Sequence, residues 1–295
     1  MVIPTRNKSA SLRITLAMLA GQSCSLPYEV VVVDDGCTDG TRRMLERMRS
    51  RSDWSLRVVD GPRLGRAGAR NAGARATRGQ RLLFLDDDVL TGRGHLEAHQ
   101  RQGERTFAHG PLREFVGARR WMERYADADP QETAVRGTSV LAGAAGRLLT
   151  NTLESLINAM DDGSVPPVAP WAAFVGANTS VSRAVFDELQ GFDEAFGQGW
   201  GCEDLEFGAR LVDAGVRPVV LPEAAGVHLT HARPDRWEQH DVNLRHFLAR
   251  HDLPAVRLLP LLLSEGGGVQ EYVGACVEAA RRLGDAAHSP ATKGH

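Results

Sequence analysis

The chain has 295 residues, 42% of them hydrophobic and 24% charged, with a formal net charge of −2, values typical of a soluble globular protein and not of a bulk nucleic-acid binder. No apolar run reaches the roughly 20 residues that span a bilayer, because the densest one, at 258–263, is short and contains Pro260. The four cysteines lack the paired spacing of zinc or redox sites and the N-terminus lacks the layout of a signal peptide, so we expect a reduced, cytoplasmic protein with no transmembrane segment.

The first 95 residues alternate between predicted strands and helices. Four short apolar or β-branched runs predict strands, at Val2-Ile3, 29–33, 55–60 and 81–85. Helices are predicted between them over 38–48, with Asp39 or Thr41 as its cap, and over 65–79, with Gly79 as its end. This β-α-β-α-β order implies an α/β fold with a mainly parallel central sheet flanked by helices.

Polar residues follow three of these strands at the point where each one ends. They are Pro4-Thr5-Arg6, Asp34-Asp35 and Asp86-Asp87-Asp88. Ligands of open parallel sheets bind beyond the carboxyl ends of the strands, so we expect the three clusters to meet at one edge. Adjacent carboxylates raise each other's pKa unless a positive group lies among them. Either water screens these charges in an ordinary loop, or a cation does.

The expected edge suits a nucleoside diphosphate. Four basic side chains could neutralise its phosphates: Arg6, Lys8, Arg66 and Arg70. Asp35 could accept hydrogen bonds from the base or the ribose, and an aspartate-bound Mg²⁺ or Mn²⁺ could bridge the phosphates. Turn formation or helix capping explains Asp34-Asp35 equally well. A turn rarely needs three carboxylates, so the triple aspartate favours a functional role.

Residues 96–196 carry weaker signals. The predicted elements are, in order, helices over 111–130 and 149–160, a Pro- and Gly-rich loop over 161–170, a strand from residue 171, a break at Gly176-Ala177-Asn178, a short strand, and a helix ended by Gly191. The loop could be a lid over a substrate, although a surface linker is the default.

The stretch 197–215 combines a glycine-flanked tryptophan with two adjacent acids. Apolar residues at helical spacing predict a helix that begins near Glu203 and closes at Gly215. Glu203 and Asp204 then lie in its first turn, where acids complement the helix dipole without any further function. The neighbouring Trp200 favours a functional role for the two acids, because an indole can pack on a sugar face and a carboxylate can accept a hydroxyl proton.

Two histidines follow the next predicted strand, 217–221. His228 and His231 are three residues apart in a predicted loop and could reach one cation together with a carboxylate. The spacing alone is a weak signal, because single loop histidines usually belong to the surface.

From residue 236 onward the chain is helical in pattern, and its last residues, 286–295, are predicted to be disordered.

Several motifs, in their order along the chain, resemble the family 2 glycosyltransferases of the GT-A fold, a Rossmann-like fold. They are VIPTRN, EVVVVDDGCTDGT, ARNAGARATRGQRLLFLDDDV, GANTSVSRAVFDELQGFDEAF and GWGCEDLEFGARLVDAG. The last of these, together with VHLTHARPD, also resembles the β-1,4-galactosyltransferase group. The resemblance covers about residues 1–235, and several independent motifs make it specific.

The resemblance implies an inverting transferase that uses a sugar nucleotide, with a UDP-sugar as the default, and a divalent cation, Mn²⁺ or Mg²⁺. Asp86-Asp87-Asp88 corresponds to the DxD motif of the family. The implied donor-binding residues are Pro4, Thr5, Arg6, Asp35, Arg66, Arg70, Asp86 and Asp87. The implied metal ligands are Asp88, His231 and His228. Asp204 matches the catalytic base and Glu203 its neighbour, while Trp200 and Gly201 match the acceptor-binding loop.

The same resemblance divides the chain. We expect a catalytic domain over 1–235, with a nucleotide-sugar half at 1–95 and an acceptor and catalytic half at 96–235. A helical extension over 236–295 follows, which could pack on the domain, form a homodimer or contact a membrane surface, with core packing as the default. Only Met1-Val2-Ile3 are available for the first strand, so we expect a few residues to precede them.

The implied acceptor is a hydroxyl group of a glycan, a lipid-linked molecule or a small molecule. Two other functions stay open. A nucleotidyltransferase would usually carry a Gly-rich loop after the first strand, whereas VIPTRNKSASLR contains no glycine. A non-catalytic sugar-nucleotide-binding protein would not need Asp88, Glu203 and Asp204 together.

Overall fold

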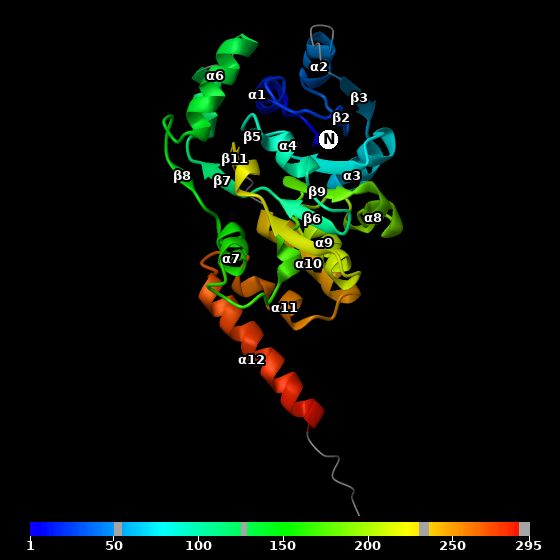
Figure 1. The fold of residues 1–295 in the computed structure, drawn as a ribbon, viewed down its shortest axis with the longest axis vertical. Coiled ribbons are helices and arrows are strands. Elements are labelled where there is room, and N and C mark those ends of the chain that lie inside the picture. The colour runs from blue at the N-terminus through cyan, green and yellow to red at the C-terminus, as the bar shows by residue number, and fades with distance from the viewer. Residues whose placement is uncertain (50–54, 125–128, 230–235, 289–295) are drawn as a thin grey trace, which may run out of the picture.

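A seven-stranded sheet forms the centre of the molecule in the computed structural model, which describes residues 1–49, 55–124, 129–229 and 236–288 (Figure 1). Its strands, in the order in which they lie in the sheet, are β10 Arg217–Val220, β6 Thr106–His109, β9 Asn178–Ser182, β4 Arg81–Leu85, β1 Val2–Thr5, β2 Val30–Asp34 and β3 Leu56–Asp60. The neighbours β4, β1, β2 and β3 are parallel, as are β6 and β10. Strand β9 is antiparallel to both β4 and β6. The expected mainly parallel sheet is therefore confirmed.

The side chains of β2 alternate between the two faces of the sheet and contribute to two buried hydrophobic clusters. The helices of this half are α1 Ser9–Leu19, α2 Thr41–Arg49, α3 Gly65–Ala76 and α4 His95–Gln100. Val31 and Val33 pack into the cluster that contains Ala67 of α3, whereas Val30 and Val32 pack into the cluster that contains Leu16 of α1. Successive side chains of a strand point to opposite faces, so the run of valines is buried on both sides of the sheet.

A second, four-stranded sheet lies beside the end of β4. Its strands, in order, are β5 Val89–Thr91, β11 Gly226–His228, β7 Leu112–Phe115 and β8 Leu148–Leu149. Strand β11 pairs with β5 so that His228 lies opposite Val89, and with β7 so that His228 lies level with Glu114. This small sheet therefore brings residues from three distant parts of the chain next to Asp88.

The middle of the chain adds further helices and short turns to the fold. These are α5 Ala118–Arg124, α6 Pro130–Leu141, α7 Thr152–Asp161, α8 Arg183–Glu188 and α9 Glu203–Asp213, with short 3₁₀ turns η1 Pro170–Ala173, η2 Glu194–Phe196 and η3 Pro222–Ala224. The start of α9 at Glu203 is confirmed, as is the loop that precedes Pro170.

Three expected elements are wrong in type or extent. The helix predicted over 111–130 is a strand, β7, followed by α5, because Leu112 and Phe115 are buried in the second sheet. The strand predicted from residue 171 is the turn η1, which begins at Pro170 and packs its backbone against Gly208 of α9. Helix α3 ends at Ala76 and not at Gly79, because Thr77 is extended (φ −86°, ψ 159°).

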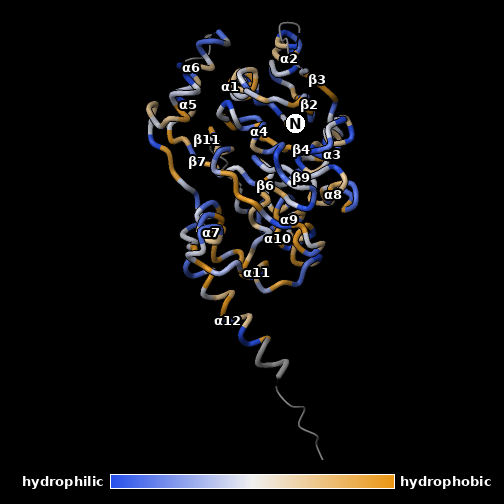
Figure 2. The backbone as a smooth tube through the Cα atoms, viewed as in Figure 1, coloured by the Kyte–Doolittle hydropathy of each residue, from blue (hydrophilic) through white to orange (hydrophobic). Residues whose placement is uncertain are grey.

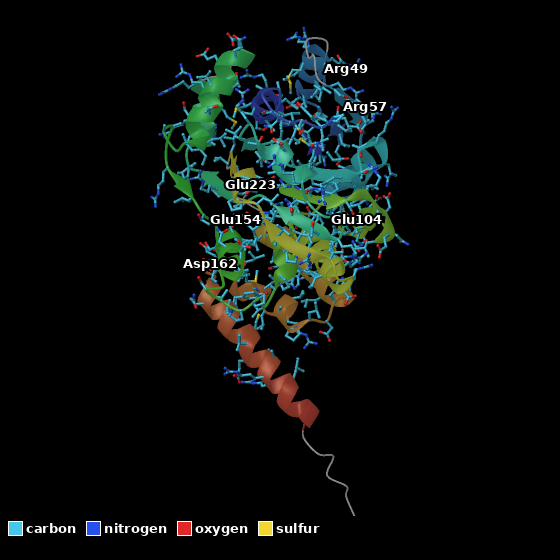
Figure 3. All side chains as sticks on the ribbon, in the orientation of Figure 1. Arg49, Arg57, Glu104, Glu154, Asp162 and Glu223 are labelled. Atoms are coloured by element: carbon cyan, nitrogen blue, oxygen red, sulfur yellow. The ribbon has the colours of Figure 1, made fainter. Side chains whose placement is uncertain are left out.

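A buried polar network around Asn178 holds the turn that precedes β9. The Asn178 side-chain amide donates to the carbonyl oxygens of Gly110 and Ala224, at 2.9 Å each. Its oxygen lies 2.7 Å from Nε2 of His95. Glu154 of α7, labelled in Figure 3, lies 3.1 Å from Nε2 of His109 on the neighbouring strand β6. Buried polar groups with partners specify one backbone arrangement, so residues 176–178 are held in place.

The C-terminal part packs on the rest of the molecule. It contains α10 Arg236–Arg250, α11 Pro254–Arg257, the turn η4 Leu259–Leu261 and α12 Val269–His288, which extends away from the body in Figure 1. Leu259 and Leu262 share a buried cluster with Trp171 and Leu205. The expected core packing of the run at 258–263 is therefore confirmed. In Figure 2 apolar stretches alternate with polar ones along this region. None of the described helices has the length and apolar character that crossing a bilayer requires.

Candidate active site

The ends of β1, β2 and β4 meet as the strand order requires. The Thr5 hydroxyl donates to Oδ2 of Asp87 at 2.6 Å. The Asp35 backbone N–H donates to the carbonyl oxygen of Thr5 at 2.9 Å, and Oδ1 of Asp35 accepts from the Arg63 N–H at 2.7 Å. Pro4 lies in the fully buried β1, directly before Thr5. The three polar clusters expected at one sheet edge are therefore brought together.

The three consecutive aspartates have three different environments. Asp86 contacts the Arg70 guanidinium at 3.1 Å, and Asp88 contacts the Lys8 ammonium at 3.2 Å. Asp87 contacts no cation at such a distance among the residues that the structure describes. Burial, and then the Asp88 charge, raise its pKa to about 8. A carboxyl with that pKa is mostly protonated at neutral pH. The run therefore carries fewer negative charges than its sequence suggests.

Arg70 connects the end of β4 with the start of α9. Its guanidinium donates to Glu203 at 2.9 Å as well as to Asp86, and the residue is only 1% exposed. A Cβ on Gly176 would lie 2.7 Å from its Cζ atom, so this glycine leaves the space that the guanidinium fills. Arg66 lies one turn earlier on α3 and is half-buried. Arg70 was expected to face the donor phosphates, and in the structure it faces two carboxylates.

Asp204 lies in the first turn of α9 with both oxygens held. Its Oδ2 accepts from the Gly176 N–H at 3.0 Å, and its Oδ1 accepts from the Leu205 N–H at 2.9 Å. Burial and then the Glu203 charge raise the pKa of Asp204 to about 6, although Arg70 opposes this rise. Glu203 keeps one buried oxygen, Oε2, without a hydrogen-bond partner among the described residues. A positioned carboxylate with a pKa near neutrality is suited to accept a proton.

Asp88, His228 and Glu114 form a contact chain. Nε2 of His228 lies 3.0 Å from Oδ1 of Asp88, and its Nδ1 lies 2.9 Å from Oε2 of Glu114. Burial disfavours the imidazolium, but Asp88 and Glu114 outweigh it and hold the pKa of His228 well above its usual value. A carboxylate that fixes one ring nitrogen and turns the other toward a second carboxylate is the arrangement that supports metal-binding histidines.

The donor set fits a divalent cation, since carboxylate oxygen and imidazole nitrogen are ligands that Mn²⁺ accepts and carboxylate oxygen suits Mg²⁺. Over 1–49, 55–124, 129–229 and 236–288, no group of three His, Cys, Asp or Glu side chains is arranged to hold a metal ion. His231, the other expected ligand, lies outside the described residues.

The loop before α9 carries the expected acceptor residues. Trp200 is half-buried, and its backbone N–H donates to Oε1 of Gln239 on α10 at 3.0 Å. Gly201 has φ +98° and lies against His240 of the same helix. On the donor side, the exposed Arg6 donates to the Gln198 side chain at 3.1 Å. Residues from the two ends of the expected site are thus in contact.

Sequence reasoning missed Glu114 and Gln239 and did not foresee the burial of Arg70. Glu114 lay inside an expected helix, and Gln239 carried no motif. For Arg70 a signal was present: Ala67 and Ala74, one turn to either side, are apolar positions on the buried face of α3. An arginine on that face needs buried acidic partners.

Two family models match the chain. Residues 1–124 match glycosyl transferase family 2, and residues 164–233 match the model described as the N-terminal domain of galactosyltransferase. The two matches contain the two groups of site residues, since the first includes Thr5, Arg70 and Asp88 and the second includes Asp204 and His228.

Relatives and solved structures agree with these matches. Validoxylamine A glucosyltransferase of Streptomyces hygroscopicus subsp. jinggangensis is 33% identical over 278 residues, which cover 90% of this chain and 62% of that protein. The chain thus spans less than two thirds of this relative. The fold is similar to a mannosyltransferase from Pyrobaculum calidifontis in complex with GDP-Man and Mn²⁺ (TM-score 0.60, 20% identity, 98% of this chain and 75% of that one). It is also similar to GalNAc-T7 with UDP, GalNAc and Mn²⁺ (TM-score 0.62, 13% identity, 95% and 54%).

Proposed function

We propose that this chain, whose residues 1–124 match the model of glycosyl transferase family 2, is an inverting transferase of that family that depends on a divalent cation. It moves a sugar from a nucleoside diphosphate sugar to an acceptor hydroxyl. Residues 1–95 supply the donor half of the site, and residues 96–235 supply the acceptor and catalytic half.

One observation carries the proposal. The buried bridge from Asp86 through Arg70 to Glu203 ties the aspartate cluster after β4 to the first turn of α9. The candidate donor carboxylates and the candidate base, Asp204, therefore belong to one site although more than a hundred residues separate them in the sequence. A displacement reaction needs both in one place.

The donor half binds and orients the nucleotide. Asp35 and Thr5 hold the base and ribose end, with Asp86 and Asp87 beside them, while Arg6 and Arg66 offer positive charge to the diphosphate. Arg70 acts from behind them, because it holds Asp86 and Glu203 in place. Asp88, His228 and His231 would hold the cation. When bound, Mn²⁺ or Mg²⁺ neutralises the negative charge that builds up on the leaving nucleoside diphosphate.

The acceptor half moves the proton. Asp204 accepts the acceptor hydroxyl proton at one of its carboxylate oxygens, while that hydroxyl oxygen attacks the anomeric carbon opposite the leaving group. A single in-line displacement needs no covalent enzyme intermediate and inverts the anomeric configuration. Glu203 keeps Arg70 in place, and Trp200 with Gly201 contacts the acceptor.

The relatives suggest which donor to try first. The relative at 33% identity is named a glucosyltransferase, and among similar folds one was solved with UDP-GlcNAc and another with GDP-Man. We propose a UDP-sugar, with UDP-glucose as the first candidate, and an acceptor that is a glycan, a lipid-linked molecule or a small molecule.

The test is a thermal-shift panel with UDP, GDP and their sugars, each with Mn²⁺ or with EDTA, followed by product analysis. Ligands that bind only the native state raise its melting temperature. We expect UDP-glucose with Mn²⁺ to raise it, hydrolysis to release UDP, and an α-linked donor to give a β-linked product by NMR coupling constants. Release of pyrophosphate from UTP and glucose 1-phosphate, added in a separate reaction, would indicate a nucleotidyltransferase. A retained configuration would exclude the single displacement.

A further inference from the structure

Helix α10 holds the loop that leads into the candidate base. Gln239 accepts from the Trp200 N–H at 3.0 Å, and the Asn243 side-chain amide donates to the Gly201 carbonyl oxygen at 2.9 Å. One turn of the helix separates these two residues, so they share a face. Two successive loop residues are therefore fixed by one helix of the C-terminal extension.

The fit between this loop and α10 is close. A Cβ on Gly201 would lie 3.0 Å from Cδ2 of His240, and one on Gly199 would lie 3.2 Å from the Asn243 amide. The next residue, Cys202, has φ +69°, a left-handed conformation that is unfavourable for a residue with a side chain. Its Sγ atom lies 3.5 Å from Nε2 of His240. Contacts with α10 therefore stabilise the backbone that orients the first turn of α9.

Three rings gather where α10 meets the loop. The Trp200 and Trp237 ring centroids are 6.4 Å apart with an interplanar angle of 79°, and each centroid lies 5.9 Å from that of His240. Both indoles are half-buried, whereas His240 beneath them is buried. The two indoles form a corner at nearly a right angle, and one of them, Trp200, is four residues before Asp204.

We infer that α10 is part of the acceptor site: Trp237, with Trp200, forms an aromatic corner for a saturated, hydroxylated six-membered ring, and Gln239 is a positioning residue for Asp204. This inference rests on the proposed function. A pyranose or cyclitol ring presents C–H groups on its faces and hydroxyls around its rim. Indole faces attract the former, and loop carbonyls and carboxylates bind the latter.

Ligand-observed saturation-transfer NMR on the full chain with UDP and Mn²⁺ tests the corner. The probes are methyl β-D-glucopyranoside and myo-inositol. We expect at least one probe to bind, and Trp237→Ala to weaken that binding roughly 3- to 10-fold. Val242→Ala is the matched control, because Val242 lies on the same helix and is 56% exposed. Unchanged probe binding in Trp237→Ala, or no binding of either probe to the parent, would overturn the inference.

Hydrolysis of UDP-glucose, measured on the same variants, separates this inference from the proposed function. Val242→Ala, which lies outside the proposed corner, should hydrolyse the donor at the parental rate. A parent that binds a probe but hydrolyses no UDP-glucose would argue against the proposed donor while the corner stands. If the parent hydrolyses UDP-glucose and Trp237→Ala binds the probes as well as the parent does, the inferred aromatic corner is excluded and the proposed transferase activity is not.

The positioning role of Gln239 has its own readout. Gln239→Leu removes the acceptor of the Trp200 N–H, and Gln239→Glu keeps an oxygen there. We expect kcat for UDP-glucose hydrolysis to fall roughly fivefold in the Leu variant, the value of one hydrogen bond, with UDP affinity unchanged and rescue by the Glu variant. Glu238→Gln on the same helix is the control. Equal kcat in all three variants would show that Gln239 has no positioning role.

Discussion

The donor and acceptor sides of the site are built in different ways. On the proposed donor side, Thr5 ends one parallel strand, and Asp35 and Asp86 each follow another. The register of β1 with β2 alone brings Thr5 and Asp35 together. On the proposed acceptor side, Asp204 lies in the first turn of a helix, and Trp200 lies on a loop that α10 fixes. Strand ends are positioned by the sheet itself, whereas loops and helix starts depend on contacts between distant segments.

This difference predicts that variants on one side leave the function of the other side intact, except at the bridge between them. Substitutions of the candidate base should change turnover without changing nucleotide affinity. Substitutions of the candidate metal ligand should weaken nucleotide binding and leave acceptor binding unchanged. Only residues such as Arg70, which contacts both sides, should disturb both.

The largest effect is expected for Asp204→Asn, which keeps the shape of the side chain but cannot accept a proton. Turnover should fall roughly 10²–10⁴-fold, the usual range for a positioned base, with UDP affinity unchanged. Asp213→Asn, at the exposed end of the same helix α9, is the control and should behave like the parent. Turnover and calorimetric UDP binding are measured on the same samples. Parental turnover in a folded Asp204→Asn protein would exclude Asp204 as the base.

Arg70→Met tests the bridge. Removal of the guanidinium leaves Asp86 and Glu203 without their buried partner, so we expect the free energy of unfolding to fall by about 3–5 kcal/mol, measured by urea denaturation. Both UDP affinity and turnover should fall with it. The control Arg75→Met, on the same helix with a side chain 67% exposed, should cost at most about 1 kcal/mol. Equal stability of the two variants would mean that the bridge contributes nothing.

Metal removal addresses the donor side. We expect Asp88→Ala to weaken UDP binding in Mn²⁺ at least roughly tenfold, and Glu114→Gln to weaken Mn²⁺ binding roughly 10- to 100-fold, because Glu114 orients His228. EDTA should reduce UDP affinity of the parent and have no further effect on Asp88→Ala. The exposed Asp162→Ala serves as the control. An additional loss with EDTA in Asp88→Ala would place the cation elsewhere.

The pH profile of turnover reports on the acceptor side. A base must be ionised, and the pKa of Asp204 is raised by burial to about 6. At saturating UDP-glucose, kcat for hydrolysis should therefore fall about tenfold for each pH unit below that value. The sign for stability is opposite: the folded pKa lies above the unfolded value of 3.8, so this group favours the folded state more at low pH than above pH 6. If kcat stays constant between about pH 4.5 and about pH 7, a range that brackets this pKa, Asp204 is not the base.

The smallest effect is expected far from the site. Asp129 caps α6 by accepting from the Glu132 N–H at 2.8 Å, so Asp129→Ala should cost about 1 kcal/mol of stability. Asp129→Ser restores a capping oxygen and should recover most of it. Turnover should stay at the parental level in both. A change in turnover in either variant would show that α6 influences the candidate site, which none of the contacts described above predicts.

The donor side could be predicted from the sequence because its information is local. The β-branched run that forms β2 and the apolar run that forms β4 show where each strand ends, and parallel topology then brings the polar residues that follow to one edge. The start of α9 was equally clear, since helical spacing and the closing glycine at 215 lie within a few turns of Glu203.

The rest of the fold was less predictable because the information that specifies it is distributed along the chain. Strand β7 pairs with β11, more than a hundred residues later, and no pattern within 111–130 shows that pairing. Trp171 likewise joins a 3₁₀ turn because of its packing against Gly208. Gln239 and Asn243 lie in an extension that no motif marked. The places of these residues in the fold depend on tertiary contacts alone.

The insertion of β9 between β4 and β6 has a consequence for synthesis of the chain. Neither β4 nor β6 has its neighbour on that side until residues 178–182 exist. While the ribosome is still making residues 110–177, both strands carry open edges. Open strand edges are the features of a partly made protein that are most prone to pair with other chains. The two halves of the sheet thus join in one late event. A chain that stalls before this point should be a substrate for chaperones and proteases.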